Sequence, residues 1–272
     1  MYSGTTLRNH SGRLIGAHQK LDRVSRRALE AALPGVNFPT IKEILQFEGR
    51  NGPDGIKSKS PAQDEPWHYY DPTDPKDTLL IKMIEQHSKN LTAALKAGRR
   101  EKAAFEAAWQ AHAIVDGLTP AHHFPLAERL EELRGEGLET RTTIKDKLIV
   151  KGEGDSKIEM LAKNWEVWGA KGVMTTHGLY EWGVATIIAP LRLKSGYPTK
   201  QDCRDVLQTG IIPIFKAAAQ HIHELEMYER FAHKGWTRGL GRETREVLAP
   251  QIVRVITLAW YESAAKAQGL TE

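Results

Sequence analysis

Disulfide-forming cysteines, long apolar runs and a strong charge of one sign are all lacking in this chain. The single cysteine, Cys203, excludes an intramolecular disulfide and fits a reducing compartment. No apolar run approaches the roughly 20 residues that span a bilayer, and residues 1–12 lack the apolar core of a secretory signal. The sequence as written therefore predicts a cytoplasmic protein, or a secreted one whose signal has been removed.

The charge balance is only mildly basic. Lysine and arginine number 38 against 34 aspartates and glutamates, which gives a formal net charge of +4. That excess is compatible with a phosphate-bearing substrate, but it is far from the signature of a nucleic-acid-binding protein. A hydrophobic content of 40% over 272 residues is ordinary for a soluble globular protein. We interpret residues 1–272 as a single domain.

Strand-type alternation and internal repeats are also missing, whereas apolar residues recur at helical spacing. Thr40 and Glu43 form a capping-box pattern, Asp77 is a candidate N-cap, and Gly98 is a candidate helix stop. The sequence predicts an all-α multi-helix bundle. The expected helices cover residues 7–33, 40–47, 77–95, 100–118, 126–133, 157–168, 173–188, 200–233 with a kink at Pro213, and 242–266 with Pro250 inside it or at its edge.

Two regions interrupt the helical pattern. Residues 48–77 are rich in proline and glycine, which predicts a long loop without regular elements, and loops of that length in compact domains are usually functional or disordered. The aromatic run 67–70 argues against disorder. Residues 135–155 are rich in glycine and contain a β-like piece at 147–150, which predicts a small hairpin or a mobile flap.

A metal-binding pattern lies where the helix over 100–118 ends. His112 and Asp116 are four residues apart, so they share one face of that helix. Gly117 and Pro120 then break the helix, and His122 follows. Imidazole and carboxylate groups brought together at a helix end are typical ligands of zinc. Helical bundles commonly build such sites from side chains that point inward.

Further candidate ligands are spread along the chain. His177 and Glu181 form a second pair at helical spacing, His18 lies on the apolar side of the first helix, and the long loop carries Asp54 and His68. The complete set is His18, Asp54, His68, His112, Asp116, His122, His177 and Glu181.

In these residues the chain resembles the bacterial zinc-dependent phospholipases C, which are related to the single-strand-specific zinc nucleases. The resemblance rests on several local matches in family order over residues 17–181. These are the first helix with His18, Asp54 placed fourteen residues before His68, the segment Trp67-His68-Tyr69-Tyr70-Asp71-Pro72, the His-x3-Asp-x5-His pattern of residues 112–122, and the His-x3-Glu pattern of residues 177–181. The final ~90 residues carry no matching motif.

The resemblance implies two or three zinc ions and a phosphoester hydrolase. It would place one zinc on His68, His112 and Asp116, with Asp54 as a further ligand or the general base. It would place a second zinc on His122, His177 and Glu181. A third would lie on His18, bridged to the first by Asp116. Tyr69 and Tyr70, with Trp67, are the local candidates for contacting the substrate.

The chain departs from the family pattern in two places. The family completes its third site with an N-terminal tryptophan, but no tryptophan precedes Trp67 here. The third metal is therefore missing, completed by His10 or Asp22, or replaced by a weaker ion. Residues 124–174 also form an insertion between the two halves of the second site, which we expect to alter substrate access and not the metal chemistry.

Three functions stay open at this stage. The first is a zinc-dependent phosphodiesterase of the phospholipase C type, acting on a phospholipid or a smaller phosphoester. The second is a single-strand nuclease of the same fold, and the third is a non-catalytic protein whose metals staple its helices. We assign no metal role to the other histidines, and we assign five tryptophans to the core. These residues are His10, His87, His123, His221, His223 and His233, with Trp109, Trp165, Trp168, Trp182 and Trp260.

Overall fold

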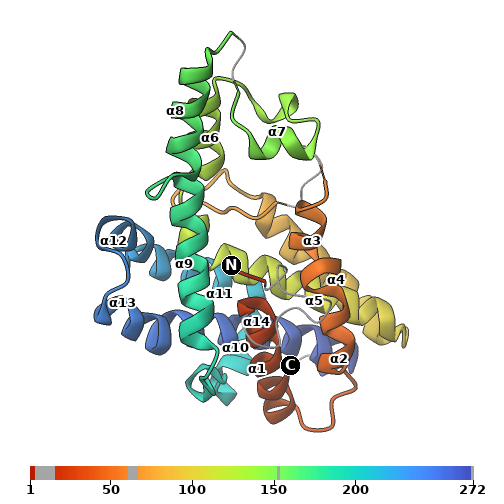
Figure 1. The fold of residues 1–272 in the computed structure, drawn as a ribbon. Helices are drawn as coiled ribbons and strands as arrows, with labels where there is room; N and C mark the ends of the chain where they lie inside the picture. Colours follow the sequence, from red (N-terminus) through yellow and green to blue (C-terminus); the bar gives the residue numbers. More distant parts are fainter. Residues whose placement is uncertain (4–15, 61–66, 152–153, 271–272) are drawn as a thin grey trace.

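The computed structural model describes residues 1–3, 16–60, 67–151 and 154–270. Helices make up the regular structure, and no strand occurs within these ranges, which confirms the predicted all-α bundle (Figure 1). Within the same ranges, no helix is both long enough and apolar enough to cross a bilayer.

Short 3-10 turns, α-helices and one π-helical segment make up the described regular structure. Short 3-10 turns cover Leu45–Phe47, Gly49–Asn51 and Pro120–His122. The α-helices are α1 (Ala17–Ala32), α2 (Ile41–Ile44), α3 (Pro53–Lys57), α4 (Leu79–Lys96), α5 (Arg100–Gly117), α6 (Leu126–Arg134), α7 (Ile144–Leu148), α8 (Lys157–Trp168), α9 (Val173–Ile188), α10 (Lys200–Thr209), α11 (Ile211–His223), α12 (Met227–Lys234), α13 (Arg238–Glu243) and α14 (Ala249–Ala267).

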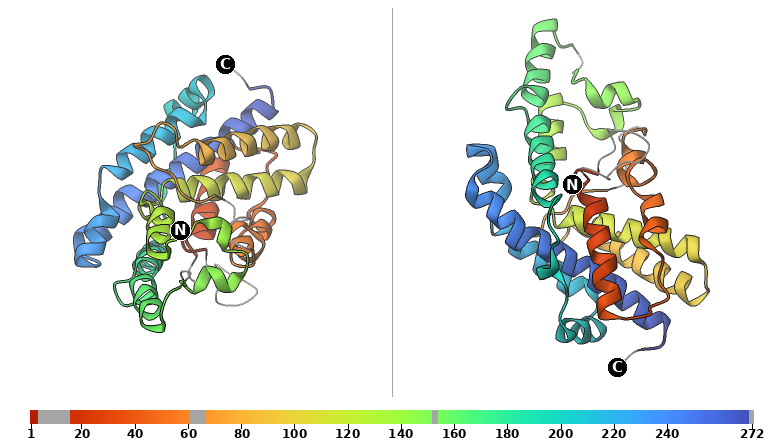
Figure 2. Two further views of the ribbon diagram at one scale, coloured as in Figure 1. Left: turned by 90° about the horizontal axis from the view of Figure 1, so that it is seen from above. Right: turned by 60° about the horizontal axis from the view of Figure 1, so that its bottom comes forward.

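Helix α14 runs through the middle of the body of the molecule (Figure 2). It packs against α1, α4, α5, α10 and α11, and its side chains are buried on most sides. Trp260 of α14 is fully buried, and its indole N–H donates to the Ala107 carbonyl of α5 at 3.1 Å. This bond matters because a buried indole N–H without a partner would be destabilising. The final ~90 residues thus hold α5, the helix that carries His112 and Asp116.

An arm built from α6, α7 and α8 projects from this body (Figure 1). Helix α9 continues from α8 back into the body, and the first residue of the chain lies where the arm meets the body (Figures 1 and 2). The arm corresponds to the insertion at residues 124–174.

The expected loop over residues 48–77 contains regular structure that the sequence analysis excluded. Helix α3 begins at Pro53, where the missing N–H of proline is harmless because the first turn has no intrahelical partner for it. Gly55 lets α3 approach the preceding turn closely, since a Cβ there would lie 2.2 Å from the Arg50 carbonyl oxygen. The prediction of an irregular segment was therefore wrong for residues 49–57, and residues 61–66 lie outside the described part.

The β-like piece at 147–150 is also not a strand. Helix α7 covers its first two residues and begins with a capping box, in which the Thr143 hydroxyl accepts from the Asp146 N–H and the Asp146 carboxylate accepts from the Thr143 N–H. These two bonds satisfy the free N–H groups of the first turn. The hairpin expected over residues 135–155 is replaced by short helical turns.

Three helix ends differ from the expectation. The predicted helix over residues 200–233 is broken twice, at Gly210, which has a φ of 76°, and at residues 224–226 between α11 and α12. Pro213 sits in the first turn of α11, where it needs no kink. A π-helical segment over Thr244–Leu248 precedes Pro250, which lies at the start of α14. Asp77 does not cap α4, because its carboxylate accepts from the Asp71 N–H. Of the first predicted helix, residues 7–15 lie outside the described part.

Candidate metal centre

The carboxylate of Asp116 lies at the centre of the predicted site. Its Oδ2 is 2.6 Å from His68 Nδ1 and 3.2 Å from His112 Nε2. Its Oδ1 is 3.4 Å from both His18 Nε2 and His122 Nδ1. The two oxygens of one carboxylate thus face different groups of imidazoles, which is the arrangement a bridging ligand requires. All five side chains are buried.

His112 and Asp116 meet because α5 places them one turn apart near its end. The helix stops at Gly117, where a Cβ would come within 2.6 Å of Leu80 and Phe215 side-chain atoms. The turn Pro120–His122 then folds the chain back, so that the Tyr70 N–H donates to the His122 carbonyl at 3.1 Å. This bond ties the segment after His68 to the end of α5.

A second group forms around Glu181. His122 Nε2 lies 2.8 Å and His177 Nε2 lies 3.0 Å from Glu181 Oε1. Helix α9 provides His177 and Glu181 on one face, as the spacing predicted. The rings of His122 and His177 are stacked, with centroids 5.2 Å apart. The second predicted trio is therefore together in the structure.

Asp54 joins the first group from α3. Its Oδ1 is 3.7 Å from His112 Nε2 and 4.0 Å from His68 Nδ1. Asp54 also faces a cavity of about 370 Å³ that opens beside the cluster. This cavity brings both groups to one opening, lined by Met1, Tyr2, Ser3, Asp54, Lys57, Ser58, His68, Tyr69, His122, Trp168, Met174, His177, Gly178 and Glu181.

Of the two residues predicted to contact the substrate, only one lies at the cavity. Tyr69 lines the cavity and lies with its ring 5.4 Å from that of His122. Tyr70 is buried and packs against Phe215 at 5.4 Å, so the prediction of a substrate contact was wrong for this residue. Neighbouring residues in an extended segment point to opposite sides, which explains the difference.

The donor atoms fit divalent metal ions. Two ligand atoms on one tetrahedral zinc ion, with bonds of about 2.1 Å, lie roughly 3.4 Å apart. The separations above run from 2.8 to 3.7 Å for His112 with Asp54 and Asp116, and for Glu181 with His122 and His177. Among the described residues, several buried ring nitrogens have no hydrogen-bond partner, which is unfavourable unless a metal or water binds them. On the candidate ligands they are both nitrogens of His18, Nε2 of His68 and His112, and Nδ1 of His122 and His177, and the neighbouring His123 adds its Nδ1.

The cluster stabilises positive charge at its centre. The amino group of Met1 lies 2.6 Å from Asp116 Oδ1 and 3.2 Å from Glu181 Oε1. Burial alone would lower the pKa of this amine, but the surrounding carboxylates, Asp116 first, raise it to about 10. The buried ammonium of Met1 lies between the two groups, so the carboxylates of Asp116 and Glu181 can stabilise a cation there.

The ligand groups themselves have displaced pKa values. Burial would raise the pKa of Asp116 and Glu181, but the nearby ammonium and imidazoles hold both well below the usual range. Burial and the Met1 charge lower the pKa of His122 to about 3. Ionised carboxylates and a neutral imidazole are the protonation states that bind metal.

Two buried carboxylates were missed by the sequence analysis or given another role. Glu48 lies 3.2 Å from His112 Nδ1, and no motif in the sequence marks it. Asp22, one candidate for completing the third site, lies instead near Glu48, where burial and the Glu48 charge raise the pKa of its carboxyl. His10, the other candidate, lies outside the described residues. His18, Glu48 and His112 form a third group of side chains that could hold a metal ion.

The remaining histidines mostly have structural partners. His123, the sequence neighbour of His122, lies with Nε2 2.9 Å from the Gly117 carbonyl oxygen. His87 lies 2.5 Å from the buried Glu106. The assignment of the tryptophans to the core was wrong for three of them, because Trp165, Trp168 and Trp182 are exposed.

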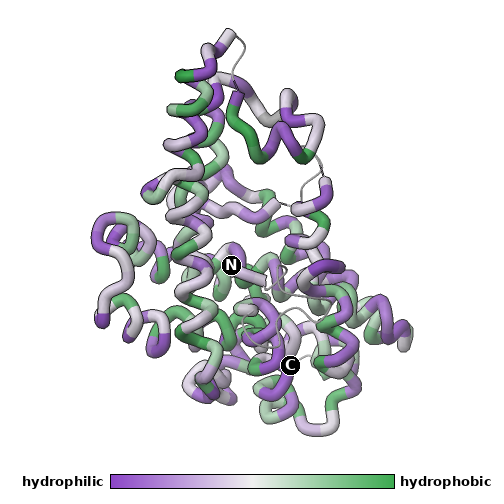
Figure 3. Tube along the Cα trace, viewed as in Figure 1, coloured by the Kyte–Doolittle hydropathy of each residue, from purple (hydrophilic) through white to green (hydrophobic). Residues whose placement is uncertain are grey.

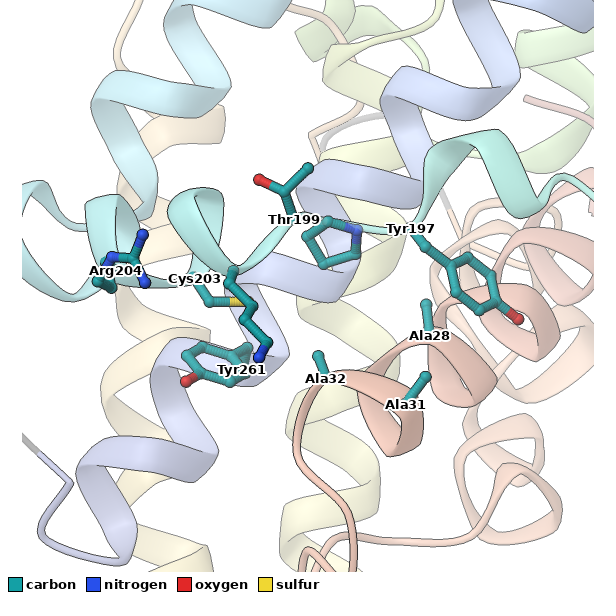
Figure 4. Close-up of a pocket in the computed structure, with 10 residues that line it drawn as sticks. Ala28, Ala31, Ala32, Tyr197, Thr199, Cys203, Arg204 and Tyr261 are labelled. Atoms are coloured by element: carbon teal, nitrogen blue, oxygen red, sulfur yellow. The ribbon is translucent and has the colours of Figure 1, made fainter.

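A second cavity lies elsewhere in the molecule, between α1, α10 and α14 (Figure 4). It measures about 400 Å³ and is lined by three alanines, Tyr197, Cys203 and Tyr261 among others. It shares no lining residue with the cavity beside the metal ligands. Of these two cavities, only the one where the arm meets the body is lined by candidate metal ligands.

No family model matches this chain, and no curated protein matches it.

Proposed function

We propose that this protein is a metal-dependent phosphoester hydrolase that resembles the zinc-dependent phospholipases C. The observation that carries the proposal is the convergence of two groups of buried imidazoles and carboxylates on Asp116, beside a cavity of about 370 Å³. A site that only staples helices is closed by protein on all sides, whereas a catalytic site keeps a position open to substrate.

The proposed metals are two or three zinc ions. His68, His112 and Asp116 would hold the first, with Asp54 as a further ligand or the general base, and His122, His177 and Glu181 would hold the second. His18 would contribute to a third through Asp116. Neutral imidazole combined with carboxylate is a donor set that suits zinc. Bound zinc would neutralise the phosphoryl charge and lower the pKa of water to about 7.

The residues of the chain would supply the remaining chemistry. Asp54 is partly exposed to the cavity, and its pKa is lowered, with His112 and His68 offsetting the effect of burial. An ionised carboxylate in that place can accept a proton from the attacking water. Lys57 also lines the cavity and can pair with the anionic phosphoryl oxygens. Burial of the imidazoles keeps their nitrogens free of bulk water.

One observation favours the nuclease alternative. Tyr69 lines the cavity, and the Lys57 ammonium lies 5.3 Å from the centre of its ring. An aromatic ring beside a lysine is a platform on which an unpaired base can stack. The net charge of +4 is modest for a nuclease, however, and we rank a phospholipid or a smaller phosphoester first.

A substrate panel tests the proposal. The zinc-loaded protein would be assayed on a chromogenic phosphodiester, a chromogenic phosphomonoester, phosphatidylcholine and single-stranded DNA, each with and without a chelator. We expect chelator-sensitive hydrolysis of a phosphodiester, and lipid cleavage without DNA cleavage would separate the first function from the second. Absence of chelator-sensitive hydrolysis on all four substrates would contradict the proposal and favour the stapled, non-catalytic protein.

Asp54→Asn provides the matched variant. It keeps the size of the side chain and removes its basicity. If Asp54 accepts the proton, we expect activity to fall by about a hundredfold or more, while zinc stays bound to His122, His177 and Glu181. Full activity of the Asp54→Asn variant would mean that Asp54 does not accept the proton.

A further inference from the structure

Helix α8 exposes four large apolar side chains to solvent. Ile158, Leu161 and Trp165 are 81%, 71% and 71% exposed. Their spacing of three and four residues places them in one stripe, and Trp168, 42% exposed, continues it. We call these four side chains the α8 stripe. Figure 3 shows apolar residues along this helix and at the end of α7.

The opposite side of α8 makes polar contacts with the rest of the arm. The Asn164 amide donates to the Val150 carbonyl at 2.7 Å and accepts from the Val150 N–H at 3.1 Å. Lys163 forms an ion pair with Asp155 at 2.9 Å. Of the apolar side chains of α8, only Val167 is buried, whereas surface helices normally turn most of their apolar residues to the core.

The α8 stripe is joined to a second apolar surface. The Trp168 indole N–H donates to the Leu148 carbonyl at 2.8 Å, so the end of α7 lies beside the end of the stripe. Leu148 and Ile149 are both exposed there. A contiguous apolar surface of this kind on a soluble protein usually marks a place where another molecule binds.

The Trp168 end of the stripe lies at the mouth of the candidate site. Trp168 belongs to the stripe and also lines the cavity with Asp54, His122 and His177. A rigid protein seated on the whole stripe would cover this mouth. A fluid lipid surface would instead bring its phosphodiester headgroups to the cavity while α8 lies in the surface.

The charges of α8 indicate which lipid surface fits. Lys157 and Lys163 are balanced by Glu159 and Glu166, so the helix has no net charge. It therefore lacks the excess of lysine and arginine with which interfacial helices bind anionic lipids. Two exposed tryptophans suit the boundary between headgroups and acyl chains, because each ring is apolar and its N–H is polar.

We propose that the α8 stripe docks this protein on a zwitterionic phospholipid surface, with α8 lying in the plane of the headgroups and the cavity facing them. The stripe spans eleven residues from 158 to 168, or about 15 Å of helix, which fits an interfacial position and not a spanning one. The choice of lipid as the occupant rests in part on the proposed phosphoesterase function.

The test is sedimentation of the full chain with vesicles of pure phosphatidylcholine. The double variant Leu161→Ser, Trp165→Ser removes the middle of the stripe, and neither residue lines the cavity. Leu79→Ser is the matched control, because Leu79 is 53% exposed at the start of α4 in the body. We expect the wild type and the control to bind vesicles equally, insensitive to salt, and the double variant to bind at least tenfold more weakly.

Other outcomes would overturn the docking. They are no binding of the wild type, binding only to vesicles with anionic lipid and only at low salt, or a lipid-free dimer that the double variant abolishes. Hydrolysis of a soluble phosphodiester is measured in parallel. Soluble hydrolysis without vesicle binding would overturn the docking alone, and vesicle binding without any hydrolysis would support the docking and contradict the proposed function.

Discussion

Glu48 contacts His112 on the side of the imidazole ring that faces away from Asp116 and Asp54. The Glu48 Oε1 atom lies 3.2 Å from His112 Nδ1, whereas His112 Nε2 faces Asp116 and Asp54. A carboxylate at Nδ1 fixes the proton on that nitrogen and leaves Nε2 to bind metal. Burial of Glu48 keeps this orientation free from competition by water.

The first prediction concerns this contact. Glu48→Gln should lower zinc affinity by about 10- to 100-fold, because the amide orients His112 less well and makes its ring a weaker donor. Competition with a chromogenic chelator measures the change. Glu128→Gln, an exposed glutamate in the arm, is the control and should leave zinc affinity unchanged. Equal affinities in both variants would mean that Glu48 has no positioning role.

A pair of adjacent histidines gives the second prediction. His122→Gln should lose one zinc ion per chain, because His122 contacts both Glu181 and Asp116. His123→Gln should keep its zinc, since His123 contacts the Gly117 carbonyl instead. Elemental analysis of the two purified variants tests this difference. Loss of zinc from His123→Gln but not from His122→Gln would mean that His123, and not His122, is the metal ligand.

The third prediction concerns the glycine that follows Asp54. Gly55→Ala should destabilise the protein by about 1–3 kcal/mol and weaken zinc binding, because its Cβ would lie 2.2 Å from the Arg50 carbonyl oxygen and push α3 away. Gly178→Ala has nothing within 4 Å of the added Cβ and should stabilise α9 by roughly 0.5–1 kcal/mol. Denaturant unfolding of both variants measures these changes, and equal effects would contradict the packing described for α3.

The fourth prediction concerns acid stability in the metal-free protein. Burial lowers the pKa of His123 from 6.5 to about 4. Between these values the unfolded chain binds a proton that the folded chain does not, so stability falls as the pH drops from about 6.5 towards 4. For one imidazole the loss between pH 7 and pH 5 is on the order of 2 kcal/mol.

His123→Gln isolates this contribution, since the other titrating groups are common to both proteins. The difference in unfolding free energy between wild type and variant should shrink by that amount from pH 7 to pH 5, with chelator present. A difference that stays constant over this range would show that His123 is not buried in its neutral form.

Helical periodicity was enough to predict most of the helices, including α4, α5, α8 and α9. Their long amphipathic or apolar patterns decide the structure locally. The segments around Pro53 and residues 147–150 were predicted wrongly. There the outcome depends on a close approach at Gly55 and on the capping box of Thr143, features that a short window of sequence represents poorly.

Helical spacing predicted that His112 lies beside Asp116 on α5 and His177 beside Glu181 on α9, whereas the other four candidate ligands were selected mainly through the family resemblance. Glu48 could not be found in this way, since it reaches His112 across 64 residues and belongs to no motif. The exposure of Trp165 was missed for a related reason. Composition assigns tryptophan to the core on average, whereas Trp165 lies on the solvent side of α8.

The metal content of the purified protein tests the central claim most directly. Native mass spectrometry should show two or three zinc ions on each chain of wild type, all removed by chelator, and fewer on Asp116→Ala because both groups lose a shared contact. A wild-type chain that binds no divalent metal, or an Asp116→Ala chain that keeps the full number, would contradict the account.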